Sequence, residues 1–270
     1  MRDILSMPDE VFSDQLRVRS YEVARNGMVG LSTALRFCEA LATDASTALG
    51  FDPSWYQRHH TAWVVREMDI LLGRLPHIGE ELRLATWVAE YRRVQAQRDY
   101  AIWHATTGAM VARASARWAY FDTARGQLTR ISDDLLDAMQ SAGHALSLRC
   151  ATRQGNYPTS GVPAVFTLQA REYEVDTQQH INNCVYADWL SEAFYHAMQT
   201  RQPKVGGTNL RPRFYHIEYI HEVMAGDKLR IETQVAPRGE RGVISRQVIE
   251  LAESGTPVVR AYGEHLRMDP

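Results

Sequence analysis

The feature that most constrains the fold of this chain is an internal repeat. Gly79 precedes the run Leu-Arg-Leu-x-Thr, and Gly226 precedes Leu-Arg-Ile-x-Thr at the same distance, 147 positions later (226 − 79). Gly108 and Gly255 each precede Arg-Ala by five residues, again 147 positions apart (255 − 108). A constant separation over successive elements indicates a duplicated structural unit. With 270 residues, the chain can hold two such units, each with its own core.

The repeat extends toward the N-terminal side of each half. Tyr21-Glu-Val and Tyr173-Glu-Val lie 152 positions apart (173 − 21), and an apolar stripe with helical spacing follows each. The first stripe comprises Leu31, Leu35, Cys38, Ala42, Ala45 and Leu49; the second comprises Tyr186, Leu190, Ala193, Phe194 and Ala197. Each half is therefore predicted to be a strand, a long helix and four further strands. The predicted ranges are 19–26, 30–49, 62–73, 80–91, 94–105 and 109–121, then 166–175, 181–200, 210–221, 227–236, 241–253 and 257–267.

Composition changes between the two halves. Ser132 with two acids behind it predicts the capped start of a short helix, since an acidic first turn complements the helix dipole. The stretch 155–163 is rich in Gly, Pro and Ser, which is typical of a linker. We therefore predict an N-terminal domain at 1–130, a linker at 131–165 and a C-terminal domain at 166–270.

Bulk properties exclude several protein classes. Hydrophobic content of 45%, charged content of 23% and a net charge of −2 are ordinary for a globular domain and give no reason to expect nucleic acid as a partner. Three cysteines without metal-ligand spacing indicate neither a disulfide framework nor a metal site, and no cofactor is expected. No run is long enough to span a membrane, and the N-terminus lacks the apolar core of a signal peptide. The expected location is the cytoplasm.

Acidic, imidazole and amide groups gather between the predicted strand 166–175 and the helix after it. Asp176, His180, Asn182 and Asn183 all lie in this short stretch. The start of a helix carries unpaired N–H groups and a positive dipole end, which suit an oxyanion. The pattern is typical of a hydrolase. The ordinary alternatives are an Asx-turn or helix cap for Asp176, and a helix cap or a turn hydrogen bond for His180.

This stretch also resembles a known family. Asp-x-x-x-His-x-Asn-Asn-x-x-Tyr-x-x-Trp, spanning 176–189, is similar to the signature of acyl-ACP thioesterases and, more loosely, of hotdog acyl-CoA thioesterases. Further matches, such as Trp63-Val-Val and Arg-Ala-Ser-Ala-Arg-Trp118, extend the resemblance over most of 19–267. The resemblance implies an α+β fold of two tandem hotdog domains, each a long central helix wrapped by an antiparallel sheet. It implies hydrolysis of fatty acyl-ACP, or acyl-CoA, to a free fatty acid and the carrier thiol, and it leaves a homodimer open.

The resemblance assigns roles to several residues. Asp176 matches the catalytic acid, as base or as nucleophile, and His180 is a base, an acid or an orienting group. Glu222, after the strand ending Ile-Glu-Tyr-Ile-His, matches a second catalytic acid; the alternative is a solvated acid at a strand end. Gln178 is also predicted to be catalytic, although the plant pattern has Asn at this position. Val223 stands where that pattern has Cys.

Other residues are predicted to bind the substrate or to support the fold. Asn182 and Asn183 are expected to position the oxyanion or to satisfy the backbone, since an amide cannot serve as a base at neutral pH. The first half has lost the Asp-x-x-x-His pattern, so the resemblance implies that it shapes the acyl pocket, with Ala42 and Ala45 on its helix. Cys184 is expected to be a small buried hydrophobe rather than a nucleophile.

Seven basic residues could meet an acidic carrier protein or a phosphate, although a solvated face is the ordinary explanation for each. They are Arg92, Arg93, Arg98, Arg201, Lys204, Arg211 and Arg213. Two other function classes remain open. One is a tandem-hotdog hydratase or dehydratase acting on acyl thioesters. The other is a non-catalytic acyl-thioester binding module, which a site broken at Gln178 would favour.

Overall fold

The computed structural model describes residues 11–139, 141, 162–201 and 210–268. The chain divides into two compact units. Unit 1 comprises 1–29, 36–66 and 73–148; unit 2 comprises 30–35, 67–72 and 149–270. Most of the predicted linker 131–165 lies outside the described residues, as does Lys204. The boundaries predicted at 130 and 165 therefore stay predictions.

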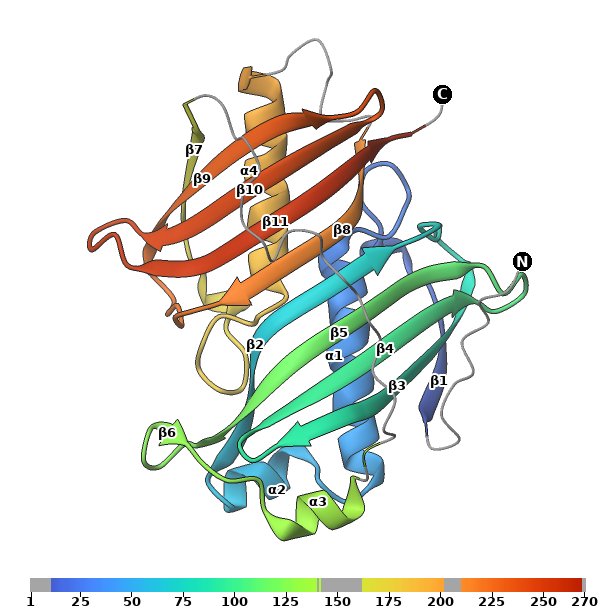
Figure 1. Ribbon diagram of the computed structural model, residues 1–270, viewed down its shortest axis with the longest axis vertical. Helices are drawn as coiled ribbons and strands as arrows, with labels where there is room; N and C mark the ends of the chain where they lie inside the picture. The colour runs from blue at the N-terminus through green and yellow to red at the C-terminus, as the bar shows by residue number, and fades with distance from the viewer. Residues whose placement is uncertain (1–10, 140, 142–161, 202–209, 269–270) are drawn as a thin grey trace. The chain divides into compact units, whose positions relative to one another are not determined.

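Unit 1 pairs a long helix with an antiparallel sheet (Figure 1). Its strands follow the order β1-β3-β4-β5-β2, and β2 runs on into unit 2 at residue 67. The first turn of α1, residues 31–35, also belongs to unit 2. The elements are β1 (Phe12–Arg17), α1 (Leu31–Ala48), α2 (Pro53–Arg58), β2 (Thr61–Leu72), β3 (Glu81–Arg92), β4 (Gln95–His104), β5 (Met110–Asp122), β6 (Gln127–Leu128) and α3 (Asp133–Ala138). Cys38 on α1 and Tyr100 on β4 are both about 1% exposed, so the core lies between the helix and the sheet.

Unit 2 has the same architecture. The strand order is β8-β11-β10-β9-β7, and residues 67–71 of β2 pair with β8. The elements are β7 (Ala164–Gln169), α4 (Val185–Arg201), β8 (Leu210–Tyr219), β9 (Lys228–Arg238), β10 (Gly242–Leu251) and β11 (Pro257–Arg267). Helix α4 packs on the sheet, where Gln247 Nε2 donates a hydrogen bond of 2.8 Å to the Leu190 carbonyl. The α+β arrangement predicted for both units, a long helix against an antiparallel sheet, is confirmed.

The two long helices bury the faces that their sequences predict. All five residues of the second stripe are buried, and within the first stripe Leu31, Leu35, Cys38 and Ala45 are buried. Leu49 is an exception at 50% exposure, because α1 ends at Ala48 and the chain turns away at Gly50. The helical spacing thus identified both helices. It misjudged their ends by one residue, except that α4 begins at Val185, four residues after the predicted start at 181.

The first strand of each half was placed too far along the chain. Strands β1 and β7 end at Arg17 and Gln169, and a short 3-10 helix follows each. In both, an acid three residues on accepts a hydrogen bond of 2.7 Å from the arginine N–H: Arg19 to Glu22, and Arg171 to Glu174. These capped turns occupy the stretches predicted to extend the strands.

Two short helices belong to unit 1. Helix α2 was not predicted, although Asp52 caps it through a 2.7 Å bond from the Trp55 N–H and Pro53 occupies its first position, both ordinary start signals. Helix α3 was predicted, and Ser132 stands at its N-cap position. The Ser132 hydroxyl makes no capping hydrogen bond.

Sheet register supports the duplication residue by residue. In unit 1, Thr86 pairs with Tyr100, which pairs with Ala114. In unit 2, Thr233 pairs with Gln247, which pairs with Ala261. Each residue in the second row lies 147 positions after its counterpart, the separation observed in the sequence.

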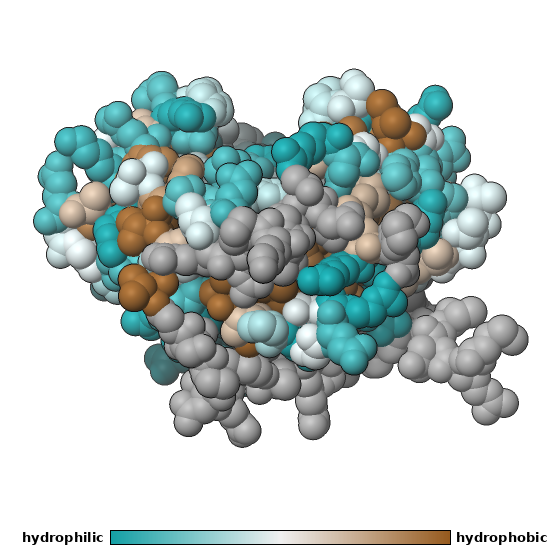
Figure 2. Space-filling view, turned by 90° about the horizontal axis from the view of Figure 1, so that it is seen from above, coloured by the Kyte–Doolittle hydropathy of each residue, from teal (hydrophilic) through white to brown (hydrophobic). Residues whose placement is uncertain are grey.

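The exposed large hydrophobic side chains are spread along the chain. Tyr21 and Tyr173, at equivalent places in the two halves, are 75% and 76% exposed. On the face seen in Figure 2, brown hydrophobic areas are small and lie among teal hydrophilic residues. None of the helices in the described part of the chain has the length and apolar character needed to cross a membrane.

Candidate active site

A tight loop in unit 2 holds the predicted catalytic residues. Val175 and Ile181 form an antiparallel bridge at its base. Within it, the Asp176 N–H donates to the His180 carbonyl at 2.8 Å, and the Gln179 N–H donates to the Asp176 carbonyl at 3.1 Å. Gln179 adopts a positive φ of 67°, which lets the chain reverse within so few residues. The backbone therefore fixes where the Asp176 and His180 side chains begin.

Asp176 makes the Asx-turn that its sequence position allowed. Its Oδ1 accepts a hydrogen bond of 2.7 Å from the Gln178 N–H. Among the described residues, its other carboxylate oxygen has no hydrogen-bond partner, and the residue is partly exposed. One oxygen thus orients the side chain, and the other remains free to contact a water molecule or a substrate.

His180 and Glu222 come together from different parts of unit 2. The His180 Nε2 lies 3.3 Å from the Glu222 Oε2, with the side chains 39% and 61% exposed. The next residues along each segment fix this meeting, because the Ile181 N–H donates to the Val223 carbonyl at 3.0 Å. A carboxylate beside one imidazole nitrogen holds a proton there and leaves the other nitrogen unprotonated, able to act as a base.

The pKa of the Tyr186 hydroxyl depends on the negative charge around this loop. Burial raises the pKa of its hydroxyl, and a hydrogen bond from the Val223 backbone opposes that rise. The carboxylates of Glu222 and Asp176 raise this pKa further. Both acids therefore act electrostatically on one buried group at the start of α4. The structure brings Asp176, His180 and Glu222 into one neighbourhood.

The two predicted amides have different surroundings. The Asn182 Oδ1 accepts a hydrogen bond of 2.8 Å from the Cys184 N–H, so this side chain organises the start of α4. Asn183 contributes its carbonyl, which accepts from the Tyr219 hydroxyl at 3.2 Å. No described residue hydrogen-bonds the Asn183 side-chain amide, nor that of the exposed Gln178. Asn183 is accordingly the better placed of the two asparagines to donate to a ligand.

Most backbone N–H groups in this loop already donate hydrogen bonds within unit 2. Between residues 178 and 185, six N–H groups have acceptors within unit 2: those of Gln178, Gln179, Ile181, Asn182, Cys184 and Val185. The expected supply of unpaired N–H groups for an oxyanion is therefore smaller than the sequence suggested. Side-chain amides then become the stronger candidates for that role.

The remaining predicted residues lie on the helices. Ala45 is buried on α1 at 5% exposure, and Ala42, one turn earlier, is partly exposed. Cys184 is 1% exposed, as expected for a small core residue. The substrate-binding roles of the two alanines stay predictions.

The described basic residues have different surroundings. Arg92 and Arg93 are exposed, whereas the Arg213 Nη1 donates a hydrogen bond of 2.6 Å to the Leu72 carbonyl. Burial lowers the pKa of Arg211, and the neighbouring Arg213 lowers it further. Arg98 is partly buried and contacts Thr86. The side chain of Arg201, like Lys204, lies outside the described part of the chain.

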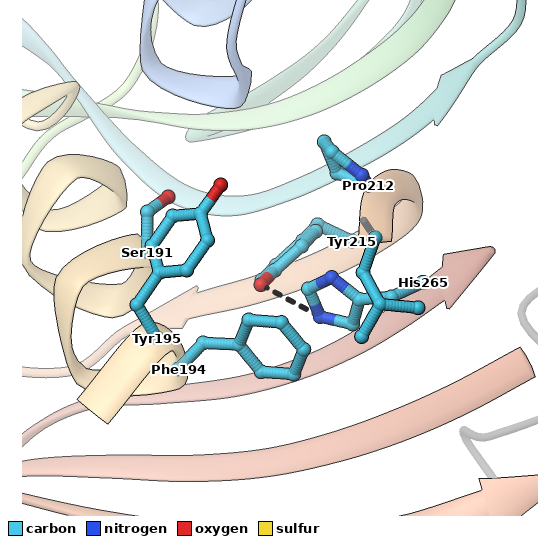
Figure 3. Close-up of a pocket in the computed structure, with 7 residues that line it drawn as sticks. Ser191, Phe194, Tyr195, Pro212, Tyr215 and His265 are labelled. Atoms are coloured by element: carbon cyan, nitrogen blue, oxygen red, sulfur yellow. Dashed lines mark hydrogen bonds between the residues drawn. The ribbon is translucent and has the colours of Figure 1, made fainter. Parts of the chain in front are cut away.

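Sequence reasoning missed a polar cluster inside unit 2 (Figure 3). The His265 Nε2 lies 3.1 Å from the Tyr215 hydroxyl and 3.3 Å from the Ser245 Oγ. The His265 ring stacks on Phe194 with a centroid separation of 3.6 Å, and burial lowers the pKa of His265 to about 3. The cluster borders a cavity of about 30 Å³, which has room for a water molecule rather than for an acyl chain.

Gly263, inside a strand, is the sequence feature that could have indicated this cluster. A Cβ added to Gly263 on β11 would lie 2.7 Å from both the Ser245 Oγ and the Tyr215 ring, closer than packed atoms allow. A glycine inside a strand often marks such a close approach.

Comparison with known proteins places both halves in one family. The family model described as the acyl-ACP thioesterase N-terminal domain matches residues 9–139, and the one described as the C-terminal domain matches residues 161–263. An oleoyl-acyl carrier protein thioesterase from Arabidopsis thaliana is 22% identical over 196 residues, which cover 67% of this chain and 54% of the relative. The chain spans about half the length of the curated relatives that it matches first.

Solved structures agree on the fold. A 12:0-ACP thioesterase from Umbellularia californica superposes with a TM-score of 0.79 at 20% identity, covering 96% of this chain and 94% of that one. An acyl-ACP thioesterase from Bacteroides thetaiotaomicron gives a TM-score of 0.73 at 17% identity, covering 94% and 97%. At this level of identity, these similarities establish the tandem hotdog fold alone.

Proposed function

Because the chain belongs to the acyl-ACP thioesterase family, we propose that it hydrolyses fatty acyl-ACP to a free fatty acid and the carrier thiol. The observation that carries this proposal is the meeting of His180 and Glu222, 3.3 Å apart, beside the loop that holds Asp176. Two acids and an imidazole near a helix start can activate water and orient it toward a thioester carbonyl.

In this mechanism, Asp176 acts on water or on the carbonyl itself. As a base, its free oxygen takes a proton from water, and the resulting hydroxide adds to the thioester carbon. As a nucleophile, the same oxygen would form an anhydride that water then cleaves.

His180 and Glu222 supply the proton for the departing sulfur. Glu222 holds the imidazole through Nε2, and the free Nδ1 of His180 can take the water proton from Asp176 and pass it to the thiolate as the C–S bond breaks. A thiolate is a good leaving group, so this transfer is the least demanding step. The unused amides of Asn183 and Gln178 are candidates to donate hydrogen bonds to the oxyanion.

The choice of carrier and the assembly state are finer parts of the proposal. Relatives named as acyl carrier protein thioesterases favour an acyl-ACP substrate, with acyl-CoA as an alternative carrier of the same thioester chemistry. A homodimer stays a prediction, which light scattering coupled to size exclusion would decide. Cytoplasmic location stays a prediction as well.

The experiment is a panel of acyl-ACP and acyl-CoA thioesters of increasing chain length. Both thiol release and the mass of the acyl product are measured. Release of thiol together with free acid supports hydrolysis. A change in unsaturation or hydration without thiol release would identify a hydratase or dehydratase instead. Binding of acyl-ACP without any turnover would identify a non-catalytic module.

A further inference from the structure

An arginine faces the interior of unit 1 without an acidic partner. Arg98 on β4 pairs in register with Val88 and Ala116, two residues before the fully buried Tyr100 on the same face of the strand. Its hydrogen bond in the described part of the chain runs from Nη1 to the Thr86 Oγ1 at 3.4 Å, and no described carboxylate forms an ion pair with it. A partly buried guanidinium with so weak a contact has most of its donors unused.

Three further donors near Arg98 are buried without a partner. They are the hydroxyls of Tyr91 and Tyr100 and the indole Nε1 of Trp118. The Trp118 indole approaches the Tyr100 hydroxyl without reaching hydrogen-bond geometry. Native proteins rarely leave buried polar groups unpaired, and each such group needs an explanation.

The charge of Arg98 reaches both hydroxyls. Burial raises the pKa of Tyr91 to about 12, and the Arg98 charge opposes this rise. The same two causes act in the same directions on the pKa of Tyr100. These groups therefore form one electrostatic neighbourhood that is rich in donors. The Arg98 charge acts on both hydroxyls, and the buried Asp99 carboxylate acts on Tyr100 in the opposite direction.

Different side chains occupy the corresponding space in the two units. Phe194 stacks on His265 at 3.6 Å, and both are less than 5% exposed. Under the repeat, Ala42 is the unit 1 equivalent of Phe194 (194 − 152), and Trp118 is the equivalent of His265 (265 − 147). Ala42, Trp118 and Arg98 are all partly exposed although they face inward, so solvent reaches this interior.

We propose that the interior of unit 1 binds the carboxylate of an aliphatic acid through Arg98, Tyr91, Tyr100 and Trp118. A carboxylate only accepts hydrogen bonds, so it matches a cluster composed of donors. One guanidinium balances its single charge, whereas a phosphate dianion would leave a second charge buried and uncompensated. Small apolar neighbours on the same face, Val88, Ala114 and Ala116, suit an aliphatic chain.

The carboxylate has two chemical sources, both of which rest on the proposed function. One is the free fatty acid that hydrolysis releases. The other is the distal carboxylate of an acyl group made from a dicarboxylic acid. Binding of a free acid requires no turnover, so this proposal can be tested even if the chain hydrolyses nothing.

The first test measures binding by calorimetry, below micelle-forming concentrations. Dodecanoate and hexadecanoate are compared with 1-dodecanol and 1-hexadecanol on the wild-type protein, Arg98→Met and Arg66→Met. Arg66 is an exposed arginine on β2 and serves as the matched control. We expect alkanoates to bind more tightly than alkanols, and Arg98→Met to weaken alkanoate binding about tenfold or more without affecting alkanols. Equal alkanoate affinity in the two variants would overturn the proposal.

A second variant guards against misfolding. Tyr100→Phe removes one unpaired buried hydroxyl, so its melting temperature should equal or exceed that of the wild type while alkanoate binding weakens. A more stable protein with unchanged alkanoate affinity would mean that the hydroxyl does not contact a ligand, and would count against the site.

Turnover then distinguishes the sources. If thioesters with a distal carboxylate have a higher kcat/KM than methyl-ended thioesters, and Arg98→Met removes that preference, the substrate supplies the carboxylate. If no preference exists and free alkanoate inhibits the wild type more strongly than Arg98→Met, the product supplies it. If no thioester releases thiol although alkanoates bind through Arg98, the proposed reaction fails and the binding site stands. If thiol is released and neither effect is seen, bound carboxylate does not take part in turnover and both sources are overturned.

Discussion

The loops that precede the two long helices have the same backbone and different side chains. The Ala24 N–H donates to the Met28 carbonyl at 2.9 Å, as Asp176 does to His180 at 2.8 Å. Bridges Val23–Val29 and Val175–Ile181 close the two loops. Gly27 has a φ of 75°, and its counterpart Gln179 has a φ of 67°.

The neighbouring segment repeats in the same way. The Val29 N–H donates to the Pro76 carbonyl at 2.9 Å, as Ile181 does to Val223 at 3.0 Å. Leu75 therefore stands where Glu222 stands in unit 2, just as Ala24 and Met28 stand where Asp176 and His180 do. All three polar groups of the candidate site are apolar in unit 1. The shared backbone holds the loop in both units, and chemistry depends on which side chains it carries.

The interiors of the two units also differ, and here unit 1 has the unpaired polar groups. In unit 2, Tyr215, Ser245 and His265 contact one another, and the position of Ser245 corresponds to that of Arg98 (245 − 147). In unit 1, the Tyr91 and Tyr100 hydroxyls and the Trp118 indole N–H, all near Arg98, lack partners among the described residues. Unit 1, which has the apolar loop, thus has more buried donors without hydrogen-bond partners among the described residues. Such a division is expected after a duplication in which one copy keeps the chemistry and the other adapts its interior.

The first prediction tests whether the loop of unit 2 alone carries the chemistry, by replacing Asp176. Asp176→Asn should lower kcat at least about 100-fold with substrate affinity changed by a few-fold, because an amide neither accepts a proton nor attacks the carbonyl. Ala24→Asp places the same group on the equivalent backbone of unit 1 and serves as the control. Single-turnover and steady-state assays of both variants give the rates.

The assignment has a definite failure point. If Asp176→Asn kept more than about a tenth of the wild-type kcat, Asp176 would be an Asx-turn residue and nothing more. If adding Ala24→Asp to that variant restored activity, the two loops would be interchangeable, and the asymmetry between the units would be wrong.

The second prediction concerns the polar core of unit 2. Burial lowers the pKa of His265 from 6.5 to about 3, so between these values the unfolded chain binds a proton that the folded chain does not. The free energy of unfolding should then fall as the pH is lowered through this window, by up to about 1.4 kcal/mol per pH unit, and this contribution should level off below it. Denaturant melts from pH 7 to pH 4 measure the slope.

Two variants isolate the histidine. His265→Gln should show a shallower acid slope, whatever its stability at neutral pH. Trp118→Phe alters the equivalent position of unit 1, where no titratable group stands, and should keep the wild-type slope. An unchanged slope in His265→Gln would mean that other groups dominate the acid sensitivity.

How far the sequence alone led can be judged from particular residues. The 147-residue separation predicted which strand positions correspond, and Thr86 and Thr233 have the expected register. The polar motif predicted the Asp176 loop because short-range spacing decides such turns. The meeting of His180 with Glu222 rested on resemblance, since 42 residues separate them (222 − 180) and spacing does not fix long-range contacts. Arg98 was predicted only as a basic residue that could meet a carrier protein or a phosphate. Its inward direction was missed, because a single charge in a strand ordinarily faces solvent.

The third prediction adds to unit 1 the side chain that fills unit 2. Ala42→Phe copies Phe194 onto α1 and should shorten the preferred acyl chain, at a stability cost of about 1–3 kcal/mol from overpacking. Ala45→Leu, one turn on, should act in the same direction. Gln178→Asn should instead change the rate at every chain length, because it alters an amide in the loop. Length profiles on acyl-ACP decide. If Gln178→Asn shifted the profile and Ala42→Phe did not, the acyl pocket would lie elsewhere.

The smallest expected effect tests whether unit 2 holds its loop under strain. Gln179 adopts a left-handed conformation that costs a non-glycine residue roughly 1–2 kcal/mol, whereas Gly27 adopts it without that penalty. Gln179→Gly should therefore stabilise the protein by up to about 1 kcal/mol after the entropy of the added glycine is counted. Gly27→Gln should destabilise it by a similar amount, and chemical denaturation compares the two. If Gln179→Gly also kept full activity, Gln179 would lower the stability of the protein without any role in the chemistry. A stabilised but slower enzyme would mean that the strained backbone helps to aim Asp176 and His180, so the loop of unit 2 would differ from that of unit 1 in mechanics as well as in side chains.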